Sequence, residues 1–421
     1  MEKAKNTSFI SLTTLALIPI VMVLGNSMLV PGLPTMESQL GISKFQSSLI
    51  ISVFSFAAGI VMPFVGYLSD RFGRKPIIGI ALLLYGLGGI FSGVTAWLIK
   101  DSYPYILIGR IFQGFGAAGT SPVAMALIGD MYKGGEESRV LGINEAANGF
   151  GKIISPILGS LIALISWYAV FFTFPVLCFI VAALTWFVIK EPERPEPVSV
   201  SKYVQKIKGI FKKKGSWLIS SFLVGSIGLF ILFGVLFYLS NILEDEYNVS
   251  GFLKGPILAI PLLGLVTTSY FTGASIKQNM KLIRKIMVLG LIILTAAMII
   301  VSFFENIYVI VALLTVGSIG IGLTLPCVNT IITGAVQKSE RGMITALYGS
   351  VRFFGVAVGP PFFGWLMDIS HRALFFTVSG ISLATLIVSY FFINPQKQSG
   401  PKTKPKDTEK RPTLNRVKAP T

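Results

Sequence analysis

The sequence has very few of the residues that build metal and redox sites. Among its 421 residues are one histidine, His371, and two cysteines, Cys178 and Cys327. Both cysteines fall inside apolar runs, so we expect buried thiols rather than a disulfide framework. These scattered ligands predict no zinc or iron site. The sequence also contains no Gly-x-x-x-x-Gly-Lys-[Ser/Thr] loop, so we expect no Walker-type ATP site, and no other cofactor is predicted.

Charged residues are scarce as well. They make up 13% of the chain, whereas about 25% is usual in soluble domains. Hydrophobic residues make up 53%, and the mean hydropathy is +0.74. Because so little polar surface cannot cover a water-soluble fold, we expect lipid to be the solvent. This composition leaves no room for a soluble catalytic domain, so the sequence does not predict an enzyme.

Long apolar runs take the place of soluble domains. Each run has about 20 residues and is long enough to cross the hydrocarbon core of a membrane as a helix. We therefore expect an all-α integral membrane protein with twelve transmembrane helices. The first run is too long for a signal-peptide core, so we expect it to remain as a mature helix. The twelve predicted spans are residues 9–30, 45–66, 77–97, 104–127, 140–164, 167–189, 216–240, 253–275, 286–304, 307–328, 342–367 and 372–393.

The basic residues are distributed unevenly between the two sides of these spans. The formal net charge is +17, which by itself can indicate a nucleic-acid partner. When the loops are assigned alternately to two sides, 29 of the 36 lysine and arginine residues fall on the side of both termini. The positive-inside rule then places both termini in the cytoplasm of a multi-pass plasma-membrane protein. We therefore expect anionic membrane lipids as partners and no nucleic acid.

The spans divide into two halves of six. Residues 1–190 are predicted to form an N-terminal bundle and residues 216–394 a C-terminal bundle. The linker, residues 191–215, begins with prolines and continues with interleaved apolar residues and lysines, which predict an amphipathic helix on the inner leaflet. A calmodulin-binding helix has a similar pattern, but a membrane surface explains it more simply. The basic tail, residues 395–421, is expected to be disordered in the cytoplasm.

A charged, glycine-rich segment at residues 66–76 separates the second span from the third. So compact a segment between two apolar runs predicts a hairpin between membrane helices. Its pattern, Gly-x-x-x-Asp-Arg-x-Gly-Arg-Lys, resembles the loop 2–3 signature of the major facilitator superfamily. The resemblance implies a monomer with two pseudo-symmetric six-helix bundles around a substrate path, and it implies that this loop latches the halves. The predicted latch residues, which otherwise serve only as positive-inside anchors, are Gly66, Asp70, Arg71, Gly73, Arg74 and Lys75.

The fourth span carries an arginine in an apolar setting. A charge there costs about 2.5–3.5 kcal/mol, so we expect Arg110 to face a cavity or a partner. The run Arg110-x-x-Gln113-Gly resembles a superfamily motif linked to proton handling, and it implies that Arg110 tunes a nearby acid. Asp130, at the end of this span, occupies the place of an acid in the latch cluster. The span also contains Gly-x-Gly-x-x-Gly, but without a preceding strand we expect helix packing, not dinucleotide binding.

Matching motifs of small residues and proline lie in the fifth and eleventh spans. The first resembles the span-five motif of drug:proton antiporters, with serine in place of two glycines. Small residues at every position predict close helix packing, and the proline permits a bend. A packing role without any effect on transport direction stays open. The motif residues are Gly151, Ser155, Pro156 and Gly159 in span five and Gly355, Gly359 and Pro360 in span eleven.

Few ionisable side chains are predicted within the spans. Glu145 is the one acid, and it is the candidate proton carrier, a role that Asp70 or Asp130 can share. Lys152 and Arg352 lie near mid-span, and with Arg110 they make three buried cations against one acid. This surplus favours neutral or anionic amphiphiles over lipophilic cations, unless the lysine is deprotonated or the cations bind backbone carbonyls. The candidate cavity residues are Asn26, Gln113, Asn148, Lys152 and Arg352.

These features together predict a proton-coupled exporter of small amphiphilic molecules that works by alternating access. One proton moving through 100 mV supplies about 2.3 kcal/mol, which sustains roughly a 50-fold gradient of a neutral substrate. Two alternatives share the same fold: a lipid or glycolipid flippase and a proton-coupled importer of organic anions. A non-transporting membrane receptor is the alternative from another class, and it would tolerate neutralisation of Arg110 and Glu145.

Overall fold

The computed structural model describes residues 9–192, 200–276, 279–334 and 341–393, and every regular element in these ranges is a helix. Within these ranges, twelve helical segments are long and apolar enough to cross a membrane, as the sequence predicts. The proline-rich start of the linker, residues 193–199, and the basic tail, residues 395–421, lie outside the described residues. The predictions made for those two segments therefore stay predictions.

The N-terminal half contains the first six spans. Two of these spans are built from consecutive pieces: α1, η1 and α2 form the span Phe9–Leu40, and α5 and α6 form the span Tyr103–Met131. The elements of this half are α1 (Phe9–Ser27), η1 (Val30–Gly32), α2 (Leu33–Leu40), α3 (Lys44–Phe72), α4 (Arg74–Leu98), α5 (Tyr103–Ala118), α6 (Ser121–Met131), α7 (Gly135–Ala163) and α8 (Val170–Val188).

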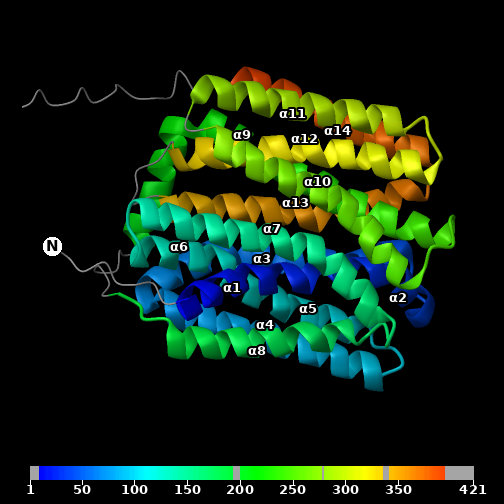
Figure 1. Cartoon of the computed structure of the whole chain (residues 1–421), viewed down its shortest axis with the longest axis horizontal. Helices are drawn as coiled ribbons and strands as arrows, with labels where there is room; N and C mark the ends of the chain where they lie inside the picture. Colours follow the sequence, from blue (N-terminus) through cyan, green and yellow to red (C-terminus); the bar gives the residue numbers. More distant parts are fainter. Residues whose placement is uncertain (1–8, 193–199, 277–278, 335–340, 394–421) are drawn as a thin grey trace, which may run out of the picture.

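The C-terminal half begins with the longest helix of the molecule. This helix starts in the linker and continues without a break into the seventh span, Gly215–Asp245. Its first turns run across one end of the bundle (Figure 1). The elements of this half are α9 (Val200–Asp245), η2 (Gly251–Leu253), α10 (Lys254–Ser275), α11 (Met280–Val301), α12 (Ile307–Gly334), α13 (Arg341–Met367) and α14 (His371–Phe392).

The predicted hairpin at residues 66–76 is shorter in the structure than in the sequence analysis. Helix α3 continues to Phe72, helix α4 begins at Arg74, and only Gly73 separates them. The backbone of Gly73 has a φ of 110°, which a glycine adopts without the strain that a side chain would add. A single residue therefore makes the turn, and most of the predicted loop residues lie on helix ends.

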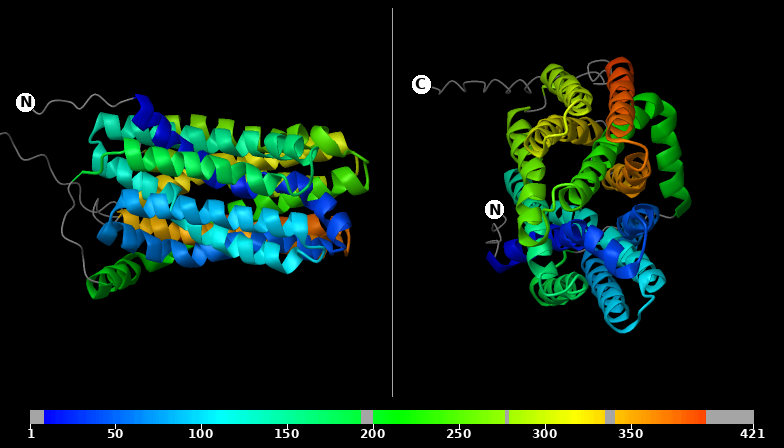
Figure 2. Two further views of the ribbon diagram at one scale, coloured as in Figure 1. Left: turned by 90° about the horizontal axis from the view of Figure 1, so that it is seen from below. Right: turned by 90° about the vertical axis from the view of Figure 1, so that its right-hand side faces the viewer.

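The two halves lie side by side along their lengths (Figures 1 and 2). Helix α3 packs along α13, and α7 packs along α10, so these two pairs form the main contacts between the halves. Within the halves, α7 packs on α1 in the way that α13 packs on α9. We call the end where α1 and α9 begin the linker end, and the end where α2 lies the far end.

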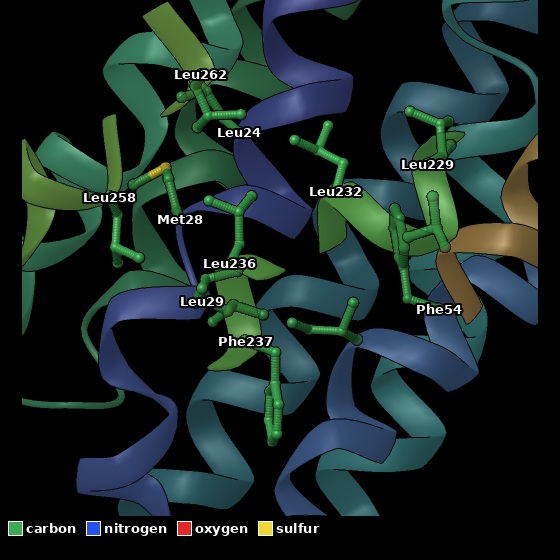
Figure 3. Packing of buried hydrophobic residues seen from close by; sticks show 14 of the residues in the cluster. Leu24, Met28, Leu29, Phe54, Leu229, Leu232, Leu236, Phe237, Leu258 and Leu262 are labelled. Atoms are coloured by element: carbon green, nitrogen blue, oxygen red, sulfur yellow. The ribbon is translucent and has the colours of Figure 1, made fainter. Parts of the chain in front are cut away.

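Apolar side chains fill the region between the halves toward the far end. Figure 3 shows Leu24 and Met28 next to Leu258 and Leu262 of α10, with Leu236 of α9 between the helices. These side chains are 2% exposed or less. By contrast, many large apolar side chains point outward, as Phe187 does at 82% exposed, and this surface suits contact with lipid tails.

Candidate functional site

A cavity of about 220 Å³ lies between the two halves. Its walls come from α1, α3, α6 and α7 on one side and from α9, α12 and α13 on the other. The lining residues extend from the middle of these helices toward the linker end, as Met125 of α6 and Thr333 of α12 show. The polar and charged lining residues are Asn26, Ser27, Ser121, Glu145, Asn148, Lys152, Asn329, Thr333, Thr345, Tyr348 and Arg352.

Three charged side chains meet in this cavity. Glu145 and Lys152 lie two turns apart on α7, and Lys152 is within electrostatic range of both Glu145 and Arg352 of α13. The guanidinium of Arg352 lies 5.4 Å from the centre of the Tyr348 ring. Within the described part of the chain, the buried Arg352 Nε and Tyr348 Oη atoms have no hydrogen-bond partner. The cavity therefore offers unused hydrogen-bonding groups to a ligand.

Arg110 lies outside the cavity, in a closed network of neutral groups. The side chain is fully buried and donates to the carbonyl oxygens of Ile50 (2.7 Å) and Gly25 (2.8 Å). It also donates to Gln113 Oε1 (2.6 Å) and Asn26 Oδ1 (2.8 Å). These four acceptors satisfy the guanidinium without an acid, and the ring of Phe54, 4.3 Å away, adds a cation–π contact. The partner expected from the sequence is thus a set of carbonyls and amides.

This placement changes the charge balance inferred from the sequence. Three cations against one acid were expected, but among the described residues only Lys152 and Arg352 join Glu145 in lining the cavity. The net formal charge of the described lining is therefore +1. Of the predicted cavity residues, Asn26 lines the cavity and also binds Arg110, whereas Gln113 is fully buried beside Arg110 and is not part of the lining.

Polar contacts join the two halves at the far end. Lys44 Nζ of α3 lies 2.8 Å from Asp245 Oδ2 of α9. The hydroxyl of Ser240 donates to the carbonyl of Val30 over 2.7 Å, and the hydroxyl of Ser160 donates to the carbonyl of Phe252 over 3.1 Å. The cavity is therefore closed off from the far end by bonded as well as apolar contacts.

Two further pairs of contacting side chains, Lys254 with Glu244 and Ser47 with Glu37, lie beside this closure. Lys254, only 1% exposed, donates to Glu244 Oε2 over 2.5 Å, and Ser47 donates to Glu37. The sequence analysis missed both because it ended the first and seventh spans before Glu37 and Glu244. The helical spans are longer, so Glu145 is not the only acid within a span. The sequence did contain one signal for these contacts: a lysine stands at the start of the second span, Lys44, and another at the start of the eighth, Lys254.

The predicted latch residues form a cluster at the linker end. Arg74 forms ion pairs with Asp70, one turn earlier, and with Asp130 of α6, where Nε and Oδ2 are 3.1 Å apart. Arg74 also donates to Ser69 Oγ over 2.6 Å. Asp130 thus joins the cluster, as the resemblance implies. In this conformation these contacts lie within the N-terminal half, and Arg71 is exposed.

A residue of the linker completes this cluster, and the sequence analysis did not single it out. The carboxylate of Glu191 accepts hydrogen bonds from the backbone amides of Arg74 (2.7 Å) and Lys75 (3.4 Å). An acid at a helix N-terminus compensates the unpaired amides and the positive end of the helix dipole. Lys75 Nζ donates in turn to the carbonyl of Ile189 over 2.8 Å. The start of the linker is therefore bonded to the latch.

Two glycines of α3 lie against the C-terminal half. A side chain on Gly59 of α3 would lie 3.1 Å from the carbonyl of Ser350, whose hydroxyl donates to the Gly59 carbonyl. A side chain on Gly66 would lie 3.4 Å from Cβ of Ala346. The predicted role of Gly66, close helix approach, thus involves α13 of the C-terminal half.

The small-residue motifs of α7 and α13 lie in equivalent places in the two halves. On α7, a Cβ added to Gly159 would lie 2.1 Å from the carbonyl oxygen of Met28, next to α1, while Gly151 faces Ile20. On α13, a Cβ at Gly359 would lie 2.5 Å from the Phe230 carbonyl of α9. Ser155 replaces a motif glycine and donates to the carbonyl of Gly151, four residues earlier (2.6 Å). The prolines of the two motifs, Pro156 and Pro360, lie inside their helices. Gly355 packs on Ser226.

The far-end ion pair gives a direct test of this closure. We expect Lys44→Ala to favour a state open at the far end, by up to about fivefold, because half-exposed ion pairs contribute up to about 1 kcal/mol. A cysteine at Ser27, in the cavity, should then react faster with an impermeant maleimide added on the far side. The two native cysteines are buried, so the background is low. Lys100→Ala, at an exposed lysine, is the control. Equal labelling rates in both variants would show that the Lys44–Asp245 pair does not hold the far end closed.

The sequence profile of the Major Facilitator Superfamily matches residues 15–283 and 243–420 of the chain. The chain belongs to the Major Facilitator Superfamily. It is therefore a membrane transporter and not an enzyme. The bacillibactin exporter of Bacillus subtilis (strain 168) is one relative of this chain. The two are 42% identical over 92% of this chain and 97% of the relative. Another is multidrug efflux protein YfmO of the same organism, 29% identical over 86% of the chain and 87% of the relative.

Solved structures show the same fold. The D-xylose–proton symporter superposes with a TM-score of 0.70 at 15% identity, covering 93% of this chain and 99% of the symporter. A bacterial homologue of the human lysosomal transporter Spinster, in an inward-facing and occupied conformation, has a TM-score of 0.66 at 17% identity. The superposition covers 92% of this chain and 96% of the homologue's chain. The twelve spans and two bundles are thus those of the superfamily.

Proposed function

We propose that this transporter exports small amphiphilic molecules from the cell in exchange for protons. The similarity to the bacillibactin exporter extends over nearly the whole of both chains, and other relatives are named as a multidrug efflux protein and a multidrug resistance protein. The positive-inside rule supports an orientation with the linker end in the cytoplasm, so the cavity would receive cargo from that side. The protein acts as a monomer, with anionic lipids around its basic face.

The cavity between the halves is the observation that carries this proposal. It is lined by both bundles, extends toward the linker end, and is bounded at the far end by the Lys44–Asp245 pair and apolar side chains. Alternating access requires that the far-end contacts break while the linker end closes. The latch cluster around Arg74 lies at the end that must close, where it can gain contacts to the C-terminal half.

Glu145 is the proton site in this proposal. It is the one acid among the described lining residues, and it lies on the same helix as Lys152. A carboxylate in the cavity can take up a proton from one side of the membrane and release it to the other as access alternates. One proton supplies about 2.3 kcal/mol per 100 mV, enough for roughly a 50-fold gradient.

The test is flux in proteoliposomes under an imposed pH gradient. Bacillibactin and ethidium serve as cargoes, and we expect pH-driven bacillibactin transport directed out of the cell-equivalent compartment. Glu145→Gln should remove the acceleration by the gradient and leave downhill exchange, because a glutamine cannot carry a proton. Asp101→Asn, at an exposed acid, is the matched control. Gradient-driven flux of wild-type size in Glu145→Gln would refute the assignment, and uptake in place of export would favour an importer.

A further inference from the structure

Two positive side chains on opposite halves of the transporter face one cavity. Lys152 belongs to α7 of the N-terminal half and Arg352 to α13 of the C-terminal half, and both line this cavity. Like charges that share one cavity repel each other, so their approach requires a compensating group. Glu145 is the one described acid in the lining, and it can compensate only one of the two.

The two cations also have unused hydrogen-bonding capacity. In the described part of the chain, Arg352 Nε is buried without a hydrogen-bond partner. The same is true of the hydroxyl of Tyr348, a residue that is only 3% exposed. No hydrogen bond or ion pair joins Lys152 to another described residue. By contrast, Arg110 has four acceptors. Since buried donors are normally paired, the open positions around Arg352 fit a ligand rather than a packing role.

The surroundings of the two cations indicate what such a ligand looks like. A guanidinium with a free edge binds a planar acid by paired, charge-assisted hydrogen bonds, and an ammonium adds a point charge. Phe54, Phe233 and Phe353 line the same cavity and suit an apolar or aromatic body. The site therefore matches an organic acid that carries one negative charge on an apolar body.

We propose that an acidic group of the cargo binds between Lys152 and Arg352 and so links the two halves. This inference rests on the proposed export function and specifies its substrate class. Without cargo, the facing cations oppose approach of the halves at the linker end. A bound anion attracts both, so cargo binding favours closure of that end. The acid can come from a soluble molecule or from a lipid headgroup, and the two share the same chemistry.

Binding measurements on the purified protein test the acid preference. N-dansylglycine and its amide form a fluorescent pair that differs in one negative charge. We expect the acid to bind at least about tenfold more tightly than the amide, a difference that corresponds to about 1.4 kcal/mol. Lys152→Gln and Arg352→Gln should each remove most of this preference, and Lys152→Arg should restore part of it. Lys100→Gln, at an exposed lysine, should behave like the wild type.

A distance measurement tests the link between the halves. Spin labels at Lys133 and Lys281, exposed residues near the linker end of the two halves, report their separation. N-dansylglycine should shorten this distance and its amide should not, and the shortening should be lost in Lys152→Gln. Equal binding of acid and amide, or shortening by both, would overturn the proposal.

Two further arms separate the possible origins of failure and of the acid. Displacement of N-dansylglycine by phosphatidylglycerol in mixed micelles would support binding of an acid between Lys152 and Arg352, with a lipid headgroup as the ligand. Displacement by bacillibactin alone would support the same binding with a soluble cargo. An acid preference without any flux in proteoliposomes would contradict the export function and support acid binding between the two cations. Flux without an acid preference would contradict acid binding alone.

Discussion

Replacing Arg110 with methionine should destabilise the transporter by about 3 kcal/mol or more, because several buried oxygen atoms would each lose a hydrogen bond to a charged group, worth about 1.5–3 kcal/mol. The guanidinium donates to four oxygen atoms from α1, the second span and its own helix. Methionine fills much of the same volume but donates to none of them. The amide oxygens of the buried residues Asn26 and Gln113 would lose these charge-assisted bonds.

Thermal unfolding in detergent micelles measures this effect, and a large fall in the midpoint is expected. Arg110→Lys should lie between the wild type and Arg110→Met, because an ammonium cannot reach four acceptors that surround a planar fork. Arg139→Met, at an exposed arginine, is the control for loss of charge. A midpoint unchanged in Arg110→Met would show that the network does not hold the first, second and fourth spans together.

Replacing Gly159 with valine should be the second severe change. A Cβ at this position would lie 2.1 Å from the carbonyl oxygen of Met28 and 2.9 Å from its carbonyl carbon. These are backbone atoms, so they cannot rotate away as a side chain can, and α1 must move from α7. Overpacking of this kind usually costs 1–3 kcal/mol, and the backbone clash places valine at about 3 kcal/mol or more.

The same helix supplies the control for this substitution. Gly142 of α7 has no atom within 4 Å of an added Cβ, so Gly142→Ala should be neutral or slightly stabilising. Folded yield from membranes and the unfolding midpoint of both variants decide the matter. A Gly159→Val protein as stable as Gly142→Ala would contradict close packing as the purpose of the span-five motif.

The sequence was sufficient for the architecture because lipid imposes a simple rule on it. Helices that cross a membrane need about 20 apolar residues, and twelve such runs are visible between charged segments. The ends of the helices were less predictable. At residues 66–76 the charges suggested a loop, but a single glycine, Gly73, makes the turn, and the charged residues continue the helices on both sides.

For the site, the sequence indicated polar residues within the spans, but it did not indicate which residues of different helices meet. Glu145, Asn148 and Lys152 recur at helical intervals, so they share a face, and all three line the cavity. Arg110 was expected to add to the same charge. Its acceptors come from distant parts of the chain, Gly25 and Ile50, and their positions depend on tertiary packing that the sequence pattern does not contain.

The pair of Lys44 and Asp245 illustrates the same limit. Each residue stands at the end of a span, where a charged side chain is common, and nothing local indicates that they meet. Glu191 was visible as part of the linker, but its role depends on the amides of Arg74 and Lys75, which the fold brings to it. The motif indicated the charged residues around Arg74, and the structure adds Glu191 as their partner.

The continuity of α9 has a practical consequence for observing the transport cycle. Its first turns pack on the C-terminal half through Ile207, Ile210 and Phe211. In the proposed transport cycle, that segment therefore tilts together with the C-terminal half. Lys208 and Lys212 point outward from it. A fluorophore attached at either position would convert each rocking event into a change of emission polarisation, so that single molecules can be timed without touching the cavity.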